Sequence, residues 1–270
     1  MSQLKSSLEK VHQSFSRSLK TYDDNAFVQL EIAQTLVKIL LDEFASNEQA
    51  AVFESAFEIG CGTGFLTKAL LENCEVKKLL LNDLVEDCEP VVEHMISKVL
   101  GSDLSWDFLA GDVNTLPLPG NHHLVCSASA LQWVNNMSAL LLRLEQCLAP
   151  NGWLLLSSFS TRHFSQLREI SVEMKNTSHD LTYLNHDDWR DLLDERFVVK
   201  NIQTHTITLT FDSVEDVLRH LRNTGVNGNA RQQWSPARMK QFVQLYTSKF
   251  AQNGQYPLSY EPIYIFAQKK

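Results

Sequence analysis

The sequence lacks long apolar runs, clustered cysteines and an excess of positive charge. No apolar run in its 270 residues approaches the ~18 residues that a membrane-spanning helix requires. The first residues are polar and amphipathic, without the apolar core of a signal peptide. The five cysteines are widely spaced and include no Cys-x-x-Cys pair, which indicates neither a disulfide framework nor a zinc site. We therefore expect a cytoplasmic protein with reduced thiols, no bound metal and no membrane contact.

The charge balance is acidic, with 24 lysines and arginines against 32 aspartates and glutamates and a net charge of −8. Nucleic-acid binding draws most of its affinity from neutralising phosphates, so this balance argues against nucleic acid as a partner. The hydrophobic content of 44% is ordinary for a folded protein and excludes wholesale disorder. Because no repeat or linker divides the chain, we expect a single domain and a monomer.

The pattern of apolar residues predicts an α/β fold. The opening segment carries one apolar helical face. From about residue 55, short apolar strands alternate with helical stretches, which predicts a parallel sheet covered by helices on both faces. We expect a turn at 149–152 between a helix and the next strand. A strand-like run at 197–211 and a terminal strand at 262–270 are expected to be antiparallel neighbours, with helical segments between them.

A glycine-rich turn at residues 58–64, Glu-Ile-Gly-Cys-Gly-Thr-Gly, follows an apolar strand and precedes a helical stretch. Glycines at such a turn permit close approach of the backbone to a ligand. The dinucleotide pattern Gly-x-Gly-x-x-Gly would need glycine at Phe65, and a phosphate-binding loop would need a lysine that the turn lacks. These two interpretations are therefore weakened. A cofactor site of another kind, or a glycine turn without a ligand, is left.

Acidic residues end the predicted strands around this turn. Glu58 leads into the glycines, Asp83 ends the next strand and Asp112 follows the one after that. In open α/β sheets, ligands bind at the carboxyl ends of the strands. Acids at this edge suit a cationic ligand, such as one that carries a sulfonium and an ammonium group.

This pattern resembles the class I S-adenosylmethionine-dependent methyltransferases over roughly residues 55–160. The resemblance implies a Rossmann-like, mostly parallel seven-stranded sheet with helices on both faces, plus N-terminal helices and helical lid inserts. It implies S-adenosyl-L-methionine as the methyl donor, with Glu58 near the methionine amine, Asp83 on the ribose and Asp112 at the adenine. The other residues that it implies around the cofactor are Gly60, Cys61, Gly62, Gly64, Leu84, Val113 and Ser127. We expect Cys61 to be a small buried side chain and not a nucleophile, because no helper base is recognisable.

The flanking motifs are more specific. Residues 14–17 read Ser-Phe-Ser-Arg, aspartate follows Tyr22, residues 130–133 read Ala-Leu-Gln-Trp, and residues 256–260 read Tyr-Pro-Leu-Ser-Tyr. Together they resemble the malonyl-[acyl-carrier-protein] O-methyltransferases of biotin synthesis over nearly the whole chain. The chain departs from that family's usual pattern at residues 222–225, within a predicted insert. The resemblance implies methylation of the free carboxylate of a malonyl thioester held on acyl carrier protein.

The implied reaction makes modest demands on side chains. A malonyl carboxylate is already ionised at pH 7, since carboxyl pKa values lie near ~4, so no general base is needed. The reaction calls for aromatic walls, a lid and a cation that orients the carboxylate. We expect Tyr22 over the methyl donor, and Gln132 and Trp133 at the acceptor mouth, with plain packing as the alternative for the two aromatic residues. The candidates for the cation are Arg17, Arg162 and Arg222.

Acyl carrier protein is acidic, so its docking surface on this chain is expected to be basic. The C-terminal insert offers Arg219, Arg222, Arg231, Arg238, Lys240 and Lys249, interleaved with Trp234 and Tyr246. Such a locally positive surface steers an acidic partner. The alternative is that these residues form ordinary solvated helix faces.

The resulting plan is a single methyltransferase domain over residues 1–270. It contains an N-terminal helical lid segment at 1–45, a cofactor-binding core at 50–160, and helical acceptor or lid inserts at 161–195 and 211–252. Three alternatives stay open. They are a methyltransferase for a small free acid or a quinone-like ring, a non-catalytic S-adenosylmethionine-binding protein, and a nicotinamide-dependent oxidoreductase. The last is disfavoured by the missing third glycine.

Overall fold

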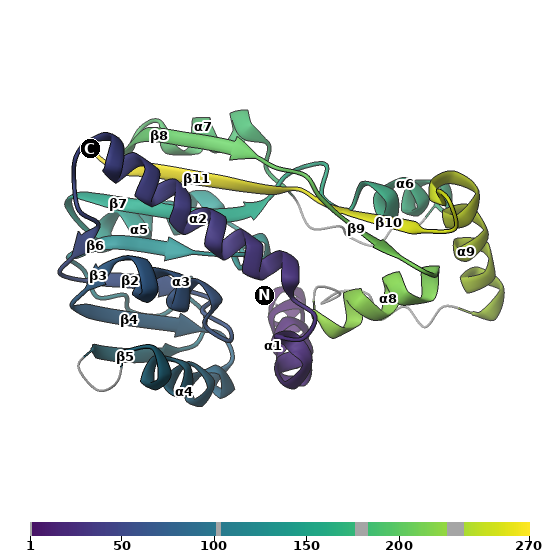
Figure 1. The fold of residues 1–270 in the computed structure, drawn as a ribbon, viewed down its shortest axis with the longest axis horizontal. Coiled ribbons are helices and arrows are strands. Elements are labelled where there is room, and N and C mark those ends of the chain that lie inside the picture. Colours follow the sequence, from purple (N-terminus) through teal and green to yellow (C-terminus); the bar gives the residue numbers. More distant parts are fainter. Residues whose placement is uncertain (1, 101–103, 176–182, 226–234) are drawn as a thin grey trace.

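A seven-stranded sheet forms the centre of the fold (Figure 1). The computed structural model describes residues 2–100, 104–175, 183–225 and 235–270. In spatial order the strands are β5 (Ser105–Ala110), β4 (Lys78–Asp83), β2 (Ala56–Ile59), β6 (His122–Ser127), β7 (Leu148–Phe159), β11 (Pro262–Lys269) and β8 (Phe197–Thr204). Strand β11 is antiparallel to both of its neighbours, and the other pairings are parallel. The sheet confirms the predicted α/β class and the antiparallel pairing of the last two long strands.

Helices cover both faces of the sheet and close two separate apolar cores. One face carries α2 (Phe27–Ser46), α3 (Phe65–Asn73) and α4 (Glu89–Leu100), and the other carries α5 (Met137–Cys147) and α7 (His186–Leu193). Successive strand side chains point to opposite faces, so Leu124 joins the first core and Val125 the second. The remaining elements of this part are α1 (Ser2–Tyr22), β1 (Val52–Phe53), β3 (Glu75–Val76) and the 3-10 turns η1 (Glu86–Cys88) and η2 (Leu131–Trp133).

A group of elements that we call the cap lobe extends beyond the carboxyl ends of the parallel strands (Figure 1). It consists of α6 (Ser165–Glu173), β9 (Ile207–Phe211), α8 (Val214–Asn223), α9 (Pro236–Phe250) and β10 (Tyr256–Tyr260). Strands β9 and β10 form an antiparallel ribbon, and the three helices pack against β10. Serine caps begin α8 and α9: Ser213 Oγ accepts a hydrogen bond from Asp216 N at 3.1 Å, and Ser235 Oγ from Arg238 N at 3.3 Å.

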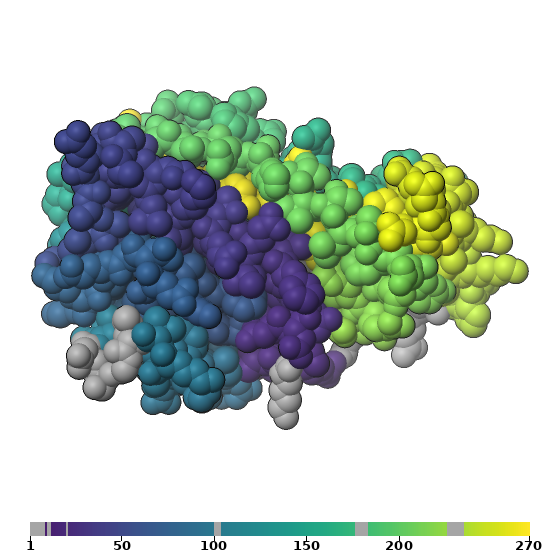
Figure 2. All heavy atoms as spheres, in the orientation of Figure 1, coloured from purple at the N-terminus to yellow at the C-terminus, as the bar shows by residue number. Residues whose placement is uncertain are grey.

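The N-terminal helix α1 connects the core to the cap lobe. It packs against α8, and Figure 2 shows the two segments in continuous contact on the surface. Ser14 Oγ donates a hydrogen bond to Gly225 O at 3.2 Å, and Asn223 Nδ2 donates to Asn25 Oδ1 at 3.2 Å. Gly225 has φ 69°, and an added Cβ would lie 2.8 Å from Ser18 Oγ, so this close approach requires glycine. These contacts place α1 beyond the carboxyl edge of the sheet.

Two local expectations differ from the structure. The run at 197–211 is two strands, because the chain leaves the central sheet after Thr204 and enters the ribbon at Ile207. The expected turn at 149–152 lies inside β7 as an irregular stretch, in which Asn151 has φ 59° and the register with β6 shifts. Pairing with β6 on both sides of this stretch holds it within the strand. Of the helices in the described ranges, none is long and apolar enough to cross a membrane.

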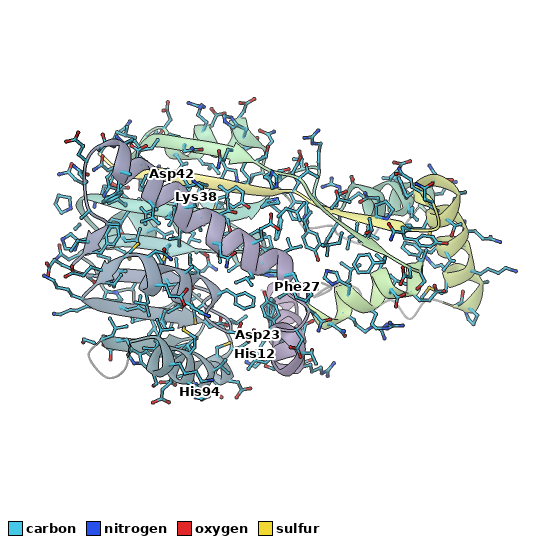
Figure 3. The ribbon with its side chains drawn as sticks, viewed as in Figure 1. His12, Asp23, Phe27, Lys38, Asp42 and His94 are labelled. Carbon is cyan, nitrogen blue, oxygen red and sulfur yellow. The ribbon has the colours of Figure 1, made fainter. Side chains whose placement is uncertain are left out.

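Helix α2 shows how burial selects one face of a helix. Ile32, Leu36 and Leu40 are fully buried at four-residue spacing. On the outward face, the Lys38 Nζ and Asp42 Oδ2 atoms lie 2.6 Å apart (Figure 3). An exposed ion pair of this kind contributes little to stability. The apolar stripe therefore holds α2 on the sheet.

Replacing Leu36 by alanine should destabilise the protein strongly. Leu36→Ala empties a fully buried position and is expected to lower the free energy of unfolding by about 2–5 kcal/mol. The matched control is Leu142→Ala, because the Leu142 side chain is 41% exposed and its loss should change stability by less than about 0.5 kcal/mol. Urea unfolding followed by circular dichroism measures both variants. Equal losses in the two would contradict this packing of α2.

Candidate active site

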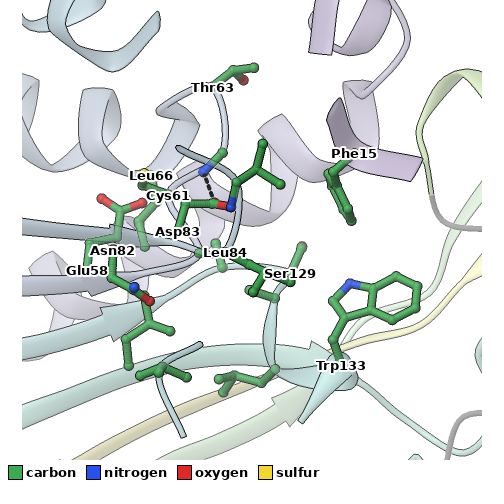
Figure 4. A pocket seen from close by; sticks show the side chains of 18 of the residues that line it. Phe15, Glu58, Cys61, Thr63, Leu66, Asn82, Asp83, Leu84, Ser129 and Trp133 are labelled. Atoms are coloured by element: carbon green, nitrogen blue, oxygen red, sulfur yellow. Dashed lines mark hydrogen bonds between the residues drawn. The ribbon is translucent and has the colours of Figure 1, made fainter. Parts of the chain in front are cut away.

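A pocket opens at the carboxyl ends of β2, β4 and β6 (Figure 4). Its empty volume is about 990 Å³ including the open mouth, within the roughly 300–1,000 Å³ of ligand sites. The predicted site residues that the structure brings together in its lining are Tyr22, Glu58, Gly60, Cys61, Gly62, Asp83, Leu84, Asp112, Val113 and Trp133. Lining residues to which the sequence analysis gave no role include Phe15, Gln29, Thr63, Phe65, Asn82 and Ser129.

The glycines of the turn serve different purposes. Gly60 has φ 66°, and an added Cβ would lie 2.3 Å from Ala130 Cβ, so the methyl group of Ala130 excludes a side chain at this position. Gly62 has φ 53° and open space at the Cβ position, which lets a ligand approach its backbone. Gly64 is placed outside the pocket lining: it caps α3, and an added Cβ would lie 2.7 Å from Met95 Cε of α4.

Glu58 is a buried carboxyl group at the end of β2. It is 1% exposed, and its Oε2 accepts a hydrogen bond from Thr67 Oγ1 at 2.6 Å. Burial raises the pKa of Glu58 to about 8, and the nearby Asp83 carboxylate adds to the rise. A cation in the pocket would favour the charged form of Glu58.

Backbone amides hold Asp83 at the end of β4. Its Oδ2 accepts a hydrogen bond from Gly62 N at 2.8 Å, and its Oδ1 accepts one from Val85 N at 2.9 Å (Figure 4). Burial raises the pKa of Asp83 even though these hydrogen bonds act against the rise. Each carboxylate oxygen keeps a further lone pair that can accept from hydroxyl groups. Beside it, Cys61 is 5% exposed, and burial raises the pKa of its thiol well above the ordinary value.

The third acid lies in the loop after β5. Asp112 Oδ1 accepts hydrogen bonds from Asn114 N at 2.9 Å and from Asn114 Nδ2 at 2.7 Å. Asn82 Nδ2 donates to Leu109 O at 2.7 Å and to Gly111 O at 3.0 Å, which fastens the end of β4 to this loop. In the sequence, the only indication of a role for Asn82 is its position directly before Asp83.

An aromatic wall closes the pocket on the side of α1. The ring centroid of Phe15 lies 6.1 Å from that of Tyr22 and 6.2 Å from that of Trp133. The centroids of Tyr22 and Phe65 are 5.9 Å apart. Burial, with smaller contributions from nearby acids, raises the pKa of Tyr22, so its hydroxyl group keeps its proton. Phe15 lies within the Ser-Phe-Ser-Arg motif and Phe65 directly follows the glycine turn, but only tertiary packing brings both rings to the wall.

Two predicted site residues lie behind the pocket lining. Gln132 Nε2 donates a hydrogen bond to Ser129 O at 2.6 Å. Ser127 is fully buried, and its Oγ donates to Ile59 O at 2.8 Å, which ties β6 to β2. The structure thus places both side chains where they position the loops that form the pocket.

The arginines proposed for the acceptor carboxylate also lie outside the pocket lining. Arg162 Nη2 pairs with Glu261 Oε1 at 2.7 Å, and the Arg162 side chain is 77% exposed. Arg17 on α1 and Arg222 on α8 are exposed. Among the lining residues that the structure describes, none is lysine, arginine or histidine.

Two further polar side chains, one on α2 and one in the glycine turn, line the pocket. Gln29 is 4% exposed and Thr63 is 6% exposed, and both line the pocket. Within the described ranges, Gln29 Oε1 and Thr63 Oγ1 have no hydrogen-bond partner. A buried polar atom without a partner is unfavourable by about 1–3 kcal/mol. Together with the three acids, these atoms fit a ligand that carries ammonium and hydroxyl groups.

Solved structures with the same fold define the class. The chain is similar to a putative methyltransferase of Bacillus halodurans, with a TM-score of 0.59, 18% identity, and coverage of 84% of this chain and 97% of that one. It is also similar to the N-methyltransferase NodS of Bradyrhizobium japonicum, solved with S-adenosyl-L-homocysteine. That comparison has a TM-score of 0.54, 15% identity, and coverage of 96% and 98% of the two chains. The fold is that of the class I methyltransferases.

Sequence comparison is more specific. Residues 57–156 match the family described as a methyltransferase domain. Over 261 residues the chain is 35% identical to the malonyl-[acyl-carrier protein] O-methyltransferase of Chlorobium luteolum, covering 96% of this chain and 95% of the relative. It is 32% identical over 274 residues to that of Bacteroides helcogenes, covering 96% and 98%. The chain belongs to the malonyl-[acyl-carrier protein] O-methyltransferase family, which confirms the resemblance of the flanking motifs.

The buried Glu58 carboxyl group predicts a pH dependence of stability. Its pKa is about 8 in the folded protein against an ordinary 4.5, so between these values the folded chain keeps a proton that the unfolded chain loses. The stabilisation is full below the ordinary pKa and is lost as the pH rises through the folded pKa, by up to about 1.4 kcal/mol per pH unit. Glu58→Gln, which keeps an acceptor for Thr67, should flatten this loss. Urea unfolding at several pH values measures it, and an identical slope in both proteins would show that Glu58 is ionised.

Proposed function

We propose that the chain is an S-adenosylmethionine-dependent O-methyltransferase that converts the free carboxylate of malonyl-acyl carrier protein into its methyl ester. The relatives are named for this substrate. The observation that carries the proposal is the pair of carboxyl groups of the buried Glu58 and the half-buried Asp83, which line one pocket without a cation among its described lining residues. We also propose a role in biotin synthesis, which the family resemblance implies, and a cytoplasmic location.

The donor site follows from the contacts of the acids. Glu58 would hold the ammonium end of the cofactor, and Gln29 and Thr63 add unpaired polar atoms to the same pocket lining. Asp83 is fixed by two backbone amides and keeps lone pairs for the two ribose hydroxyl groups. Asp112, with the buried Val113, would contact the adenine. When bound, S-adenosyl-L-methionine supplies a methyl group on a sulfonium centre that is open to nucleophilic attack.

The reaction needs positioning and exclusion of water more than proton transfer. One oxygen of the acceptor carboxylate forms the bond to the methyl carbon, while the carbon–sulfur bond breaks and its electron pair stays on sulfur. No proton is transferred in this step, so the reaction needs no general base. Tyr22 and Trp133 would shield the reacting groups, and the neutralisation of charge during attack favours such a dry site.

The alternative acceptors lead to different chemistry. A small free acid would be methylated without a carrier, and a quinone-like ring would give a product that alkali does not cleave. The flanking motifs shared with the family favour the carrier-bound acid. The pocket acids and the glycine turn are intact, which argues against a non-catalytic binding protein.

Methyl transfer to malonyl carrier is directly observable. Incubation of the protein with S-adenosylmethionine and malonyl-acyl carrier protein should add the mass of one methyl group to the carrier. Mild alkaline hydrolysis should remove this mass, because the product is an ester. Acetyl carrier, which lacks the free carboxylate, is the control and should gain nothing. No gain on malonyl carrier would overturn the proposal.

We propose that the carrier docks on exposed arginines of α1 and α8. These two helices pack against each other. Arg17 and Arg222 are exposed on these helices, whereas Arg219 pairs with Asp216 of the same helix. Lys249 pairs with two glutamates of α6. Of the other docking candidates, Arg231 and Trp234 lie outside the described residues.

Charge reversal at both arginines should weaken docking. Arg17→Glu with Arg222→Glu is expected to raise KM for malonyl carrier about tenfold at low salt, since a locally positive surface steers an acidic partner. Added salt should narrow the difference from the wild type. The matched control is Lys38→Glu on the outward face of α2, which should leave KM within about twofold. Steady-state assays at several salt concentrations test this, and an unchanged KM would remove the surface from consideration.

A further inference from the structure

Ser129 and Trp133 carry unpaired polar atoms at one end of the pocket. Within the part of the chain that the structure describes, Ser129 Oγ and Trp133 Nε1 are buried and have no hydrogen-bond partner. Both residues line the pocket after β6, and in Figure 4 both lie to the right of Glu58. Two buried donors without acceptors are together unfavourable by about 2–6 kcal/mol. A bound group that accepts from both would relieve this.

The backbone around Ser129 is held on both sides. Ser129 has φ 55°, a left-handed conformation that residues other than glycine rarely adopt. Its N–H donates to Ser157 Oγ at 3.1 Å, and its carbonyl accepts from Gln132 Nε2 at 2.6 Å. Backbone strain of this kind persists where the surroundings fix it, and it is frequent at ligand sites. The two hydrogen bonds therefore hold the backbone of Ser129 in this conformation.

The charge of this end of the pocket distinguishes two ways of holding an anion. The described lining residues include no lysine, arginine or histidine, and Arg162 is engaged with Glu261. A cation paired with the attacking carboxylate would stabilise the charged ground state more than a transition state in which that charge disappears. Neutral N–H and O–H donors orient the carboxylate with a smaller penalty of this kind.

We propose that Trp133 Nε1–H and Ser129 Oγ–H hold the acceptor carboxylate through neutral hydrogen bonds and that none of Arg17, Arg162 and Arg222 contacts it. This inference rests on the proposed function and specifies how that site recognises its acceptor. One carboxylate oxygen accepts from the two donors, and the other forms the bond to the methyl carbon as the carbon–sulfur bond breaks towards sulfur. Gln132 is a positioning residue, because it acts on the acceptor only through the Ser129 carbonyl.

The test separates recognition of the carboxylate from docking of the carrier. Dissociation constants for malonyl carrier and acetyl carrier are measured on protein saturated with S-adenosylhomocysteine, for the wild type, Ser129→Ala, Trp133→Phe and the double variant. A hydrogen bond to a charged group contributes about 1.5–3 kcal/mol to binding. Each substitution should therefore raise the dissociation constant for malonyl carrier about 10- to 100-fold. Affinities for acetyl carrier and S-adenosylhomocysteine should stay unchanged.

Matched variants provide the controls. Trp153 lies outside the pocket lining and stacks on Phe266, with the two ring centroids 4.9 Å apart. The Trp153→Phe variant should keep the preference for malonyl carrier. Gln132→Glu replaces the donor to Ser129 O by an acceptor of similar shape and should lower the preference without changing S-adenosylhomocysteine affinity.

Two outcomes would overturn the inference. One is a preference for malonyl over acetyl carrier that survives in the double variant. The other is a preference lost in Arg17→Gln, Arg162→Gln or Arg222→Gln. Wild-type protein that binds malonyl carrier but never methylates it would overturn the proposed function, whereas wild-type turnover with unaltered selectivity in the variants would overturn this inference alone.

Discussion

The rest of the structure depends on two carboxyl groups, one buried and one half-buried, that have no cationic partner in the described pocket lining. Glu58 and Asp83 end neighbouring parallel strands, so the sheet itself brings them to one edge. Burying charge is unfavourable, and the raised pKa of Glu58, about 8, expresses that penalty. The fold tolerates the penalty because β2, β4 and the glycine turn fix both groups. A cationic cofactor would pair with these carboxylates and offset the penalty, and this pairing would contribute to its binding affinity.

The pocket is chemically divided along its length. Its glycine-turn end carries the acids, while the end after β6 carries neutral donors on Ser129 and Trp133, with the aromatic wall between α1 and the core. This division suits a reaction that joins a sulfonium cation to a carboxylate anion. The acids carry negative charge where the cationic cofactor would bind. The donors at the other end are neutral, which suits a carboxylate that loses its negative charge as it reacts. Arg17, Arg162 and Arg222 lie on the outer surface, which is accessible to a carrier protein.

The sequence predicted what depends on local spacing. The glycine turn and the acids Glu58 and Asp83 were recognisable because parallel strands end at the same edge, and the sheet followed from the alternation of strands and helices. Contacts between distant segments were not recognisable. Arg162 pairs with a residue 99 positions away, which removes it from the pocket. Phe15 and Gln29 reach the pocket only because α1 and α2 pack across the sheet edge and α3.

We expect Glu58 to give up its proton when the cationic cofactor binds. Calorimetric titration with S-adenosylmethionine at pH 7, in two buffers of different ionisation enthalpy, measures the protons released. Since the pKa of Glu58 is about 8 in the absence of the ligand, we expect the wild type to release close to one proton more per bound ligand than Glu58→Gln does. Equal proton release by the two proteins would contradict it.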